Sequence, residues 1–132
     1  MADPRIRLRI DFGPRCSLGP GKVALLEAID ATGSLTQAAR RERMSYRRAW
    51  LLLEDVNSSF AEAATRSATG GRGGGGMHLT PFGRRLIEDF RGLERRVAAL
   101  GKGALGGLAG SARATRRAAG APRSLKRAAA RR

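Results

Sequence analysis

The stretch SLTQAARRERMSYRRAW, residues 34–50, determines the expected fold. Ser34 and Gln37 match a capping box, in which the serine hydroxyl accepts a hydrogen bond from a backbone N–H and the glutamine side chain reaches back. A short helix over about residues 35–41 is therefore expected. Two consecutive alanines in its middle are small enough for a close crossing with another helix.

A second helix is expected after a brief turn. Ser45 is a suitable N-cap, and the helix is expected to run from Tyr46 to Asn57 or Phe60. Its apolar residues recur at helical spacing. They are Ala49, Trp50, Leu53, Val56 and Phe60.

Two close helices joined by a turn of three or four residues make a helix-turn-helix. In DNA-binding units of this kind, the first turn of the second helix contacts base edges in the major groove. Five arginines lie here within nine residues, against the single acid Glu42. They are Arg40, Arg41, Arg43, Arg47 and Arg48. The stretch therefore predicts a positively charged surface that binds nucleic acid.

Upstream of this unit, apolar and charged residues alternate strictly over residues 5–12, RIRLRIDF. This alternation predicts a strand with one buried face. The buried residues would be Ile6, Leu8, Ile10 and Phe12. Gly and Pro then predict a loop over residues 13–21. A further helix is expected over about residues 22–32, with Gly33 as its C-terminal stop.

Downstream lies a run of six glycines and Arg72 over residues 70–76. One interpretation is a flexible linker. The other is the tip of a β-hairpin, with residues 65–69 entering, residues 77–80 leaving and Leu79 on the inner face. A hairpin directly after a helix-turn-helix is a wing, and its arginine would then enter the minor groove of DNA.

The last expected helix starts at Thr80-Pro81, an N-cap followed by proline at the first helical position, and runs to about Leu100. It carries an apolar stripe about 20 residues long. Pairing with a second copy of the chain across a two-fold axis is the favoured interpretation, and packing on the chain's own core is the alternative. The dimerisation residues would be Phe82, Leu86, Phe90, Leu93 and Val97.

The chain has 132 residues, with 26 Lys and Arg against 11 Asp and Glu, a formal charge of +15. This length fits one small domain, and the excess of basic residues favours a polyanionic partner. Residues 101–132 hold nine basic residues, no acid and few large apolar side chains. We therefore expect a folded domain over residues 1–100 and a disordered basic tail over residues 101–132. The tail is either a solvated extension or an electrostatic arm on nucleic acid.

Other functional classes lack the residues that they need. No apolar run is long enough for a membrane span, and the first residues lack the apolar stretch of a signal peptide. Cys16 and His78 are the only residues of their types, so no metal site is expected. The neighbouring acids Glu54-Asp55 and Glu88-Asp89 are expected on solvated helix faces rather than as catalytic pairs. An enzyme is therefore not expected.

Three blocks in this order, MSYRRAW (44–50), ATGGRGGGG (68–76) and LTPFG (79–83), carry a resemblance to a known family. They resemble the N-terminal DNA-binding domain of ModE-type molybdate-responsive regulators, which belong with the LysR-like winged helix-turn-helix proteins. The resemblance covers about residues 5–100. It implies a fold that is mainly α-helical with a small β-hairpin and a long C-terminal dimerisation helix.

The resemblance also implies a bacterial, cytoplasmic transcription factor that binds double-stranded DNA as a homodimer. Residues 34–41 would be the positioning helix, and residues 69–76 the wing. Trp50 is interpreted as a core residue rather than a base-contacting one, because it lies on the apolar face. The expected DNA-contacting residues are Ser45, Tyr46, Arg47 and Arg48 on the recognition helix, Ser34, Thr36, Gln37, Arg41 and Arg43 on the preceding helix and turn, and Thr69, Gly70, Gly71, Arg72 and Gly73 on the wing.

One departure from the family concerns sensing. ModE proteins continue into oxyanion-binding domains, whereas this sequence continues into the Arg/Ala/Gly-rich residues 101–132. No molybdate-sensing domain and no cofactor are therefore expected, and a separate ligand-sensing partner stays open. Two functions compete: a sequence-specific regulator, and a histone-like architectural protein in which the charge of the tail dominates.

Overall fold

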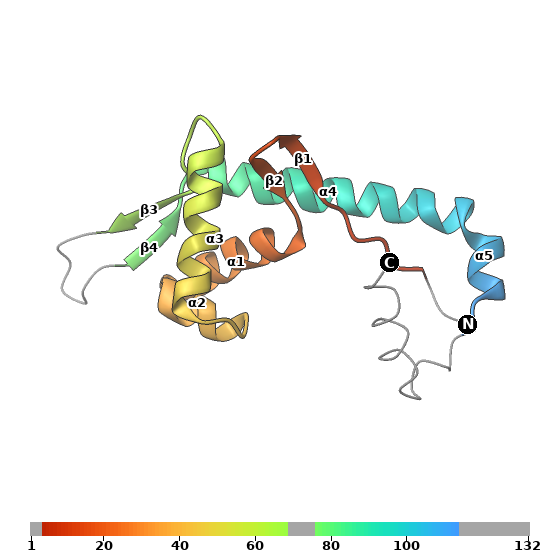
Figure 1. Ribbon diagram of the computed structural model, residues 1–132, viewed down its shortest axis with the longest axis horizontal. Coiled ribbons are helices and arrows are strands. Elements are labelled where there is room, and N and C mark those ends of the chain that lie inside the picture. Colours follow the sequence, from red (N-terminus) through yellow and green to blue (C-terminus); the bar gives the residue numbers. More distant parts are fainter. Residues whose placement is uncertain (1–3, 69–75, 114–132) are drawn as a thin grey trace. The chain divides into compact units, whose positions relative to one another are not determined.

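The computed structural model describes residues 4–68 and 76–113 of the chain. The elements, in order, are β1 (Ile10–Gly13), β2 (Cys16–Leu18), α1 (Pro20–Thr32), α2 (Leu35–Arg41), α3 (Tyr46–Ser59), β3 (Thr65–Ala68), β4 (Gly76–Leu79), α4 (Pro81–Ala104) and α5 (Gly106–Ser111) (Figure 1). The chain divides into two compact units. One is Arg7–Arg96, and the other comes from the two ends of the chain, Met1–Ile6 with Val97–Arg132.

The N-terminal strand is shorter than the alternating pattern predicts. Residues 4–9 form no regular strand, and β1 pairs with β2, which lies inside the expected loop. The expectation of a buried Phe12 is wrong, because this side chain is 56% exposed. The strand register shifts between Asp11 and Gly13, so Phe12 is the extra residue of a β-bulge. A bulge interrupts the alternation of faces and turns the side chain out of the inner row.

Helix α1 supplies the centre of the core. It starts two residues earlier than expected, with Pro20 at its first position. Its largest fully buried side chains are Val23, Leu25, Leu26 and Ile29. The predicted stop at Gly33 is confirmed: this residue has a φ of 72°, and its N–H donates to the carbonyl of Ile29 at 2.7 Å. Glycine adopts this left-handed conformation without the penalty that a Cβ brings.

The two helices of the central motif begin at their predicted caps. The Ser34 hydroxyl accepts from the backbone N–H of Gln37 at 3.1 Å, and α2 follows over its predicted range. Ala38 and Ala49 are completely buried. Because their side chains are so small, α2 can closely approach both α1 and α3. This local arrangement confirms the predicted helix-turn-helix.

The hairpin interpretation of the glycine-rich region is confirmed by the two described strands. β3 and β4 pair in antiparallel register from Thr65 opposite Leu79 to Ala68 opposite Gly76. Leu79 is 8% exposed, as expected for the inner face. The hairpin lies beside α3 (Figure 1). Its tip, residues 69–75, lies outside the described residues.

The beginning of α4 is fixed by close backbone packing. The Thr80 hydroxyl accepts from the N–H of Gly83 at 3.0 Å, which confirms the predicted N-cap, and donates to the carbonyl of Ala63 at 2.7 Å. Gly83 lies directly against the backbone of Ala64, and a Cβ at this glycine would overlap the Ala64 carbonyl. The glycine therefore permits the helix to approach the base of the hairpin.

The apolar stripe of α4 serves more than one purpose. Leu86 is 7% exposed and Phe90 2%, and both belong to the core cluster of the chain itself. Packing on the chain's own core therefore accounts for these two residues. Leu93 is 40% exposed and Val97 is half-buried. Dimerisation through these later residues stays a prediction.

Arg91 joins α4 to α1 through a two-pronged ion pair. Its Nε donates to Glu27 at 3.0 Å, its Nη2 donates to the other oxygen of that carboxylate at 2.7 Å, and its Nη1 reaches Glu94 at 2.7 Å. Hydrogen bonding to Glu27 is the largest cause that raises the pKa of Arg91 above its ordinary value.

We expect the substitution Arg91→Lys to lower the free energy of unfolding by about 1 kcal/mol, since an ammonium cannot match the planar fork. Partial exposure of the pair keeps the effect this small. Urea denaturation measures it, and Arg95→Lys on the exposed side of α4 is the matched control. Equal stabilities of the two variants would contradict a structural role for the fork.

The expectation of disorder from residue 101 onward is wrong for the first part of that segment. Helix α4 continues to Ala104, and α5 follows. Gly101 is buried, and a Cβ there would meet the side chain of Ile6. This contact with the distant N-terminal residues does not show in the local composition. Residues 114–132 lie outside the described part of the chain. In the part that is described, no helix is long and apolar enough to cross a membrane.

Candidate nucleic-acid interface

The turn between α2 and α3 has an unusual backbone at Arg43. This residue has a φ of 57°, in the left-handed region, where a side chain with a Cβ costs about 1–2 kcal/mol. Its N–H donates to Arg40 at 3.1 Å, and the N–H of Met44 donates to Ala39 at 3.0 Å. The turn thereby ends α2 and sets the direction in which α3 leaves.

We expect Arg43→Gly to raise the free energy of unfolding by about 0.5–1 kcal/mol, because glycine adopts a positive φ without strain. The matched control is Arg43→Ala, which removes the same charge and keeps the Cβ. Thermal unfolding of the two variants makes the comparison. If both variants unfold at the same temperature, the turn stores no strain.

The N-terminus of α3 presents its predicted residues to solvent. The Ser45 hydroxyl accepts from the N–H of Arg48 at 3.1 Å, and no acid lies in the first turn. Tyr46, Arg47 and Arg48 are exposed. The free N–H groups and the positive end of the helix dipole favour an anion here. Ser45, Arg47 and Arg48 line one shallow depression of about 200 Å³ together with apolar residues of α3.

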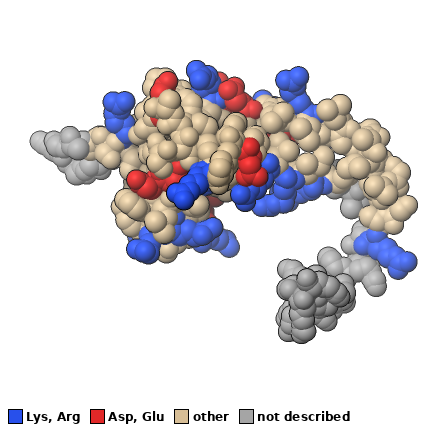
Figure 2. Space-filling view, turned by 45° about the horizontal axis from the view of Figure 1, so that its top comes forward, with Lys and Arg blue, Asp and Glu red and all other residues tan. Residues whose placement is uncertain are grey.

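The five arginines of the helix-turn-helix are all exposed. Within the described residues, none of them forms an ion pair, whereas Arg84 and Arg91 of α4 are both paired with acids. Basic side chains also occupy more of the displayed face than acidic ones (Figure 2). The arginines of the motif thus keep their charge available for an external partner.

The candidate DNA-contacting residues at the start of α2 and within it differ in exposure and in the hydrogen bonds that they form. Thr36, Gln37 and Arg41 are exposed, whereas Ser34 is half-buried and uses its hydroxyl as a cap acceptor. No hydrogen bond of the Gln37 side chain occurs among the described residues, so the reciprocal half of the predicted capping box does not form there. Gln37 therefore keeps both its amide donors and its acceptor for other contacts.

A second basic depression adjoins the first one and shares Arg48 and Leu52 of α3 with it. It has a volume of about 330 Å³ and combines Arg7, Arg9 and Arg48 with the beginning of α1. Arg9 is also within 2.9 Å of Asp11. The alternating arginines before β1 predict only the outer face of a strand, because the sequence does not show that Arg48 of α3 lies near them.

The wing is anchored to the helices at its base. The side-chain oxygen of Asn57 accepts from the N–H of Ala64 at 2.7 Å, and its amide nitrogen donates to the Thr65 hydroxyl at 3.0 Å. On the other strand, the N–H of Met77 donates to the carbonyl of Gly33 at 3.0 Å. The wing residues proposed to contact DNA lie outside the described residues. They are Thr69, Gly70, Gly71, Arg72 and Gly73.

The expectation that Trp50 is a core residue is wrong. Its side chain is 46% exposed. The buried face of α3 is narrower than the apolar pattern indicates, since Ala49, Leu53 and Val56 alone are buried on it. Trp50 follows Ala49 and is therefore rotated by about 100° from it around the helix. This rotation places Trp50 on the side that faces the hairpin, where it lines a depression with Met77.

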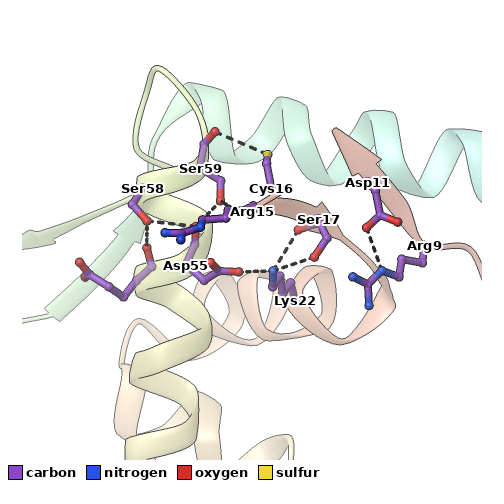
Figure 3. Close-up of polar contacts among 10 residues, drawn as sticks. Arg9, Asp11, Arg15, Cys16, Ser17, Lys22, Asp55, Ser58 and Ser59 are labelled. Atoms are coloured by element: carbon purple, nitrogen blue, oxygen red, sulfur yellow. Dashed lines mark hydrogen bonds and ion pairs between the residues drawn. The ribbon is translucent and has the colours of Figure 1, made fainter. Parts of the chain in front are cut away.

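A polar contact that the sequence analysis missed holds α3 against the rest of the domain. Lys22 of α1 donates to the Ser17 carbonyl at 3.0 Å and forms an ion pair with Asp55 of α3 (Figure 3). The lysine side chain is only 12% exposed. The Asp55 side chain is 46% exposed, so it lies on the solvated surface as expected and forms this ion pair in addition. This contact fixes α3 by the end opposite to its arginines.

The remaining candidates from the sequence are the single histidine and the single cysteine. No group of three or more His, Cys, Asp or Glu residues that could hold a metal ion occurs among the described residues. His78 is exposed on β4, as expected. The Cys16 thiol is free, half-buried and 3.5 Å from the carbonyl of Ser59, to which it donates (Figure 3).

Three helices, a following two-stranded hairpin and the start of α4 define a winged helix-turn-helix domain, as the sequence predicted. The N-terminus of α3 and the turn before it are among its exposed parts. Proteins of this class present the second helix of the motif to the DNA major groove.

The comparisons with known proteins point to one group of regulators. The transcriptional regulator ModE of Yersinia pestis is 42% identical over 85 residues, which make up 64% of this chain and 32% of that protein. The molybdenum-pterin-binding protein MopB of Rhodobacter capsulatus is 42% identical over 83 residues, or 63% of this chain and 31% of that protein. The DNA-binding transcriptional dual regulator ModE of Escherichia coli (strain K12) is 39% identical over 85 residues, with shares of 64% and 32%.

These similarities confirm the resemblance to ModE-type regulators that the three sequence blocks indicated. The chain spans about a third of the length of these curated relatives. No family model matches it.

Proposed function

We propose that this chain is a DNA-binding transcriptional regulator that recognises a particular DNA sequence as a homodimer. The observation that carries the proposal is the set of five exposed arginines, free of ion pairs within the described residues, on a helix-turn-helix. The names of the relatives support the regulatory role, since two of those cited are transcriptional regulators and one is also called DNA-binding.

The N-terminus of α3 would enter the major groove. Arg47 and Arg48 would contact base edges and phosphates, and a good bidentate contact between arginine and guanine is worth about 1–3 kcal/mol of discrimination. Arg41 and Arg43 would hold phosphates on either side and set the register. The glycine-rich segment 69–75, between the ends of β3 and β4, would lie over the adjacent backbone or minor groove.

An apolar groove on the domain supports the homodimer. It has a volume of about 430 Å³ and is lined largely by residues of β1, α4 and the end of α3. Phe12 and Leu93 are exposed at this groove, with exposures of 56% and 40%. The Phe12 ring meets that of Phe60 edge to face at 5.6 Å between centroids. A two-fold dimer that inserts both α3 helices on one side of DNA would space its half-sites by about 34 Å, or a multiple of this distance.

The test uses a duplex selected from a random pool and a shuffled control, measured by fluorescence anisotropy at several salt concentrations. We expect the full chain and a chain that ends at residue 113 both to prefer the selected duplex. Removal of residues 114–132 should reduce the salt dependence of binding, because fewer counterions are released from the DNA. Equal affinities for both duplexes would overturn the proposal and favour the histone-like alternative.

The proposal includes no cofactor and no oxyanion sensor in this chain. Added molybdate is therefore expected to leave the affinity for the selected duplex unchanged in the same anisotropy measurement. A reproducible change in affinity at micromolar molybdate would contradict this part of the proposal.

A further inference from the structure

A depression lies between the recognition helix α3 and the hairpin, on the opposite side of α3 from the Arg7 and Arg9 depression. It has a volume of about 260 Å³. Tyr46, Trp50 and Glu54 line it from α3, and Thr65, Ser67 and Met77 line it from the hairpin. All six residues lie in the compact unit Arg7–Arg96, so this depression is a feature of the winged domain itself.

The aromatic residues of this depression are more exposed than the folding of the domain requires. Tyr46 is 54% exposed and Trp50 is 46% exposed. They are four residues apart and therefore lie on one side of α3, about one turn from each other. The core contact of the helix is already made by Ala49, Leu53 and Val56. Two adjacent exposed aromatic side chains are typical of a recognition surface.

The charges around the two aromatic residues favour DNA over a protein partner as the occupant. Arg43 and Arg47 are exposed on either side of Tyr46 in the sequence, and neither forms an ion pair within the described residues. Exposed aromatic side chains with unpaired arginines close to them in the chain fit a groove floor between two phosphate backbones.

The polar groups that line the depression favour base edges, rather than phosphates, as the part of DNA that binds there. The Asn57 side chain is already bound to the backbone and hydroxyl of the hairpin base. Glu54 is the one carboxylate among the described lining residues, and a carboxylate repels phosphate but accepts from the amino group of cytosine. Trp50 lies about 6 Å along the helix from Tyr46, so both aromatic side chains belong to the N-terminal half of α3.

We propose that Trp50 is a specificity-determining residue that packs its indole ring against a thymine methyl group in the major groove. Apolar contact is the way in which proteins recognise that methyl group. The inference rests on the proposed function, because it requires α3 to lie in the major groove. It adds a residue that the pattern of the sequence assigned to the core.

The first test uses the intrinsic fluorescence of the full chain, since Trp50 is its one tryptophan. Titration with the selected duplex is expected to change the tryptophan emission, with the same midpoint as the anisotropy of the labelled duplex. The shuffled duplex at the same salt concentration should give a smaller change. Emission that stays constant while the anisotropy shows saturated specific binding would overturn the inference.

The second test removes the methyl group from the DNA. Replacement of thymine by uracil in the selected duplex is expected to weaken binding of the unmodified chain by about tenfold. Trp50→Ala should lose this difference, with nearly equal affinity for both duplexes. Leu108→Ala is the matched control, because Leu108 is 70% exposed on α5 and lies outside the proposed DNA-contacting residues. It should keep the difference between thymine and uracil.

The variants also separate this inference from the proposed function. Trp50→Phe keeps an aromatic ring and should retain most of the preference for thymine, even if Trp50→Ala loses stability. If Trp50→Ala and Trp50→Phe both respond to the missing methyl groups as the unmodified chain does, Trp50 makes no such contact. The proposed function fails separately, when the unmodified chain prefers neither the selected nor the shuffled duplex.

Discussion

Replacement of both Arg47 and Arg48 by alanine is expected to weaken binding to the selected duplex by about 100-fold or more. Both side chains are exposed at the capped N-terminus of α3 and have no acidic partner in the described residues. Each would lose about 1–3 kcal/mol of contact energy if it binds a guanine in the bidentate manner. Fluorescence anisotropy at fixed salt concentration measures the loss.

The matched control for this experiment is the double substitution of Arg95 and Arg96, two exposed arginines of α4. It changes the net charge of the chain by the same amount. We expect the control to weaken binding to the selected and the shuffled duplex equally and only slightly. The attraction between distant charges on the protein and the phosphates of DNA is screened within about 10 Å. If both double variants lose the same affinity, binding depends on net charge and not on the recognition helix.

The second large effect is expected on stability. Gly83→Ala should lower the free energy of unfolding by about 2 kcal/mol, since the new Cβ would overlap the carbonyl of Ala64. That carbonyl accepts from the N–H of Thr80 at 2.9 Å, so it cannot move away without loss of the contact between β4 and the segment before β3. For a domain of this size, the melting temperature should fall by about 10 °C.

Gly92→Ala on the same helix is the control for this prediction. A Cβ at Gly92 would meet only the side chain of Arg95, at an ordinary 3.7 Å. Alanine has the higher helix propensity, so this variant should be more stable by up to about 1 kcal/mol. Differential scanning calorimetry of both variants gives the comparison. A Gly83→Ala variant as stable as Gly92→Ala would contradict the close packing at the beginning of α4.

The parts of the fold that could be predicted are those that neighbouring residues determine. The caps at Ser34, Ser45 and Thr80 each join a side chain to a backbone group three residues away, and the stop at Gly33 joins two backbone groups four residues apart. Such contacts can be recognised from residue types at fixed offsets. They placed three helix starts and one helix end correctly, and with them the helix-turn-helix.

The wrong predictions about the fold share a physical cause, which is contact between segments that are distant in the sequence. Phe12 leaves the buried row because β2 pairs with β1 through a bulge. Residues 101–104 are helical and Gly101 is buried against Ile6 from the other end of the chain. Neither contact can be predicted from a local pattern, because the periodicity of apolar residues indicates which face of an element is buried but not which segment packs against it.

The wrong prediction for Trp50 in the candidate site also comes from packing that the sequence does not show. An apolar residue at helical spacing fits the core and the edge of the core equally well, and only the packed helix shows that Ala49 and Leu53 fill the available space. The arginines were easier to interpret, because five charges so close together cannot be buried. The residues of the wing tip stay predictions, since they lie outside the described part of the chain.

The most direct test of the central claim removes hydrogen-bond acceptors from the major groove alone. Every purine of the selected duplex is replaced by its 7-deaza analogue, which lacks the N7 acceptor and leaves the minor groove and phosphates unchanged. If α3 recognises DNA in the major groove, the affinity of the full chain should fall to near that for the shuffled duplex. An affinity that stays at its original value would contradict the account.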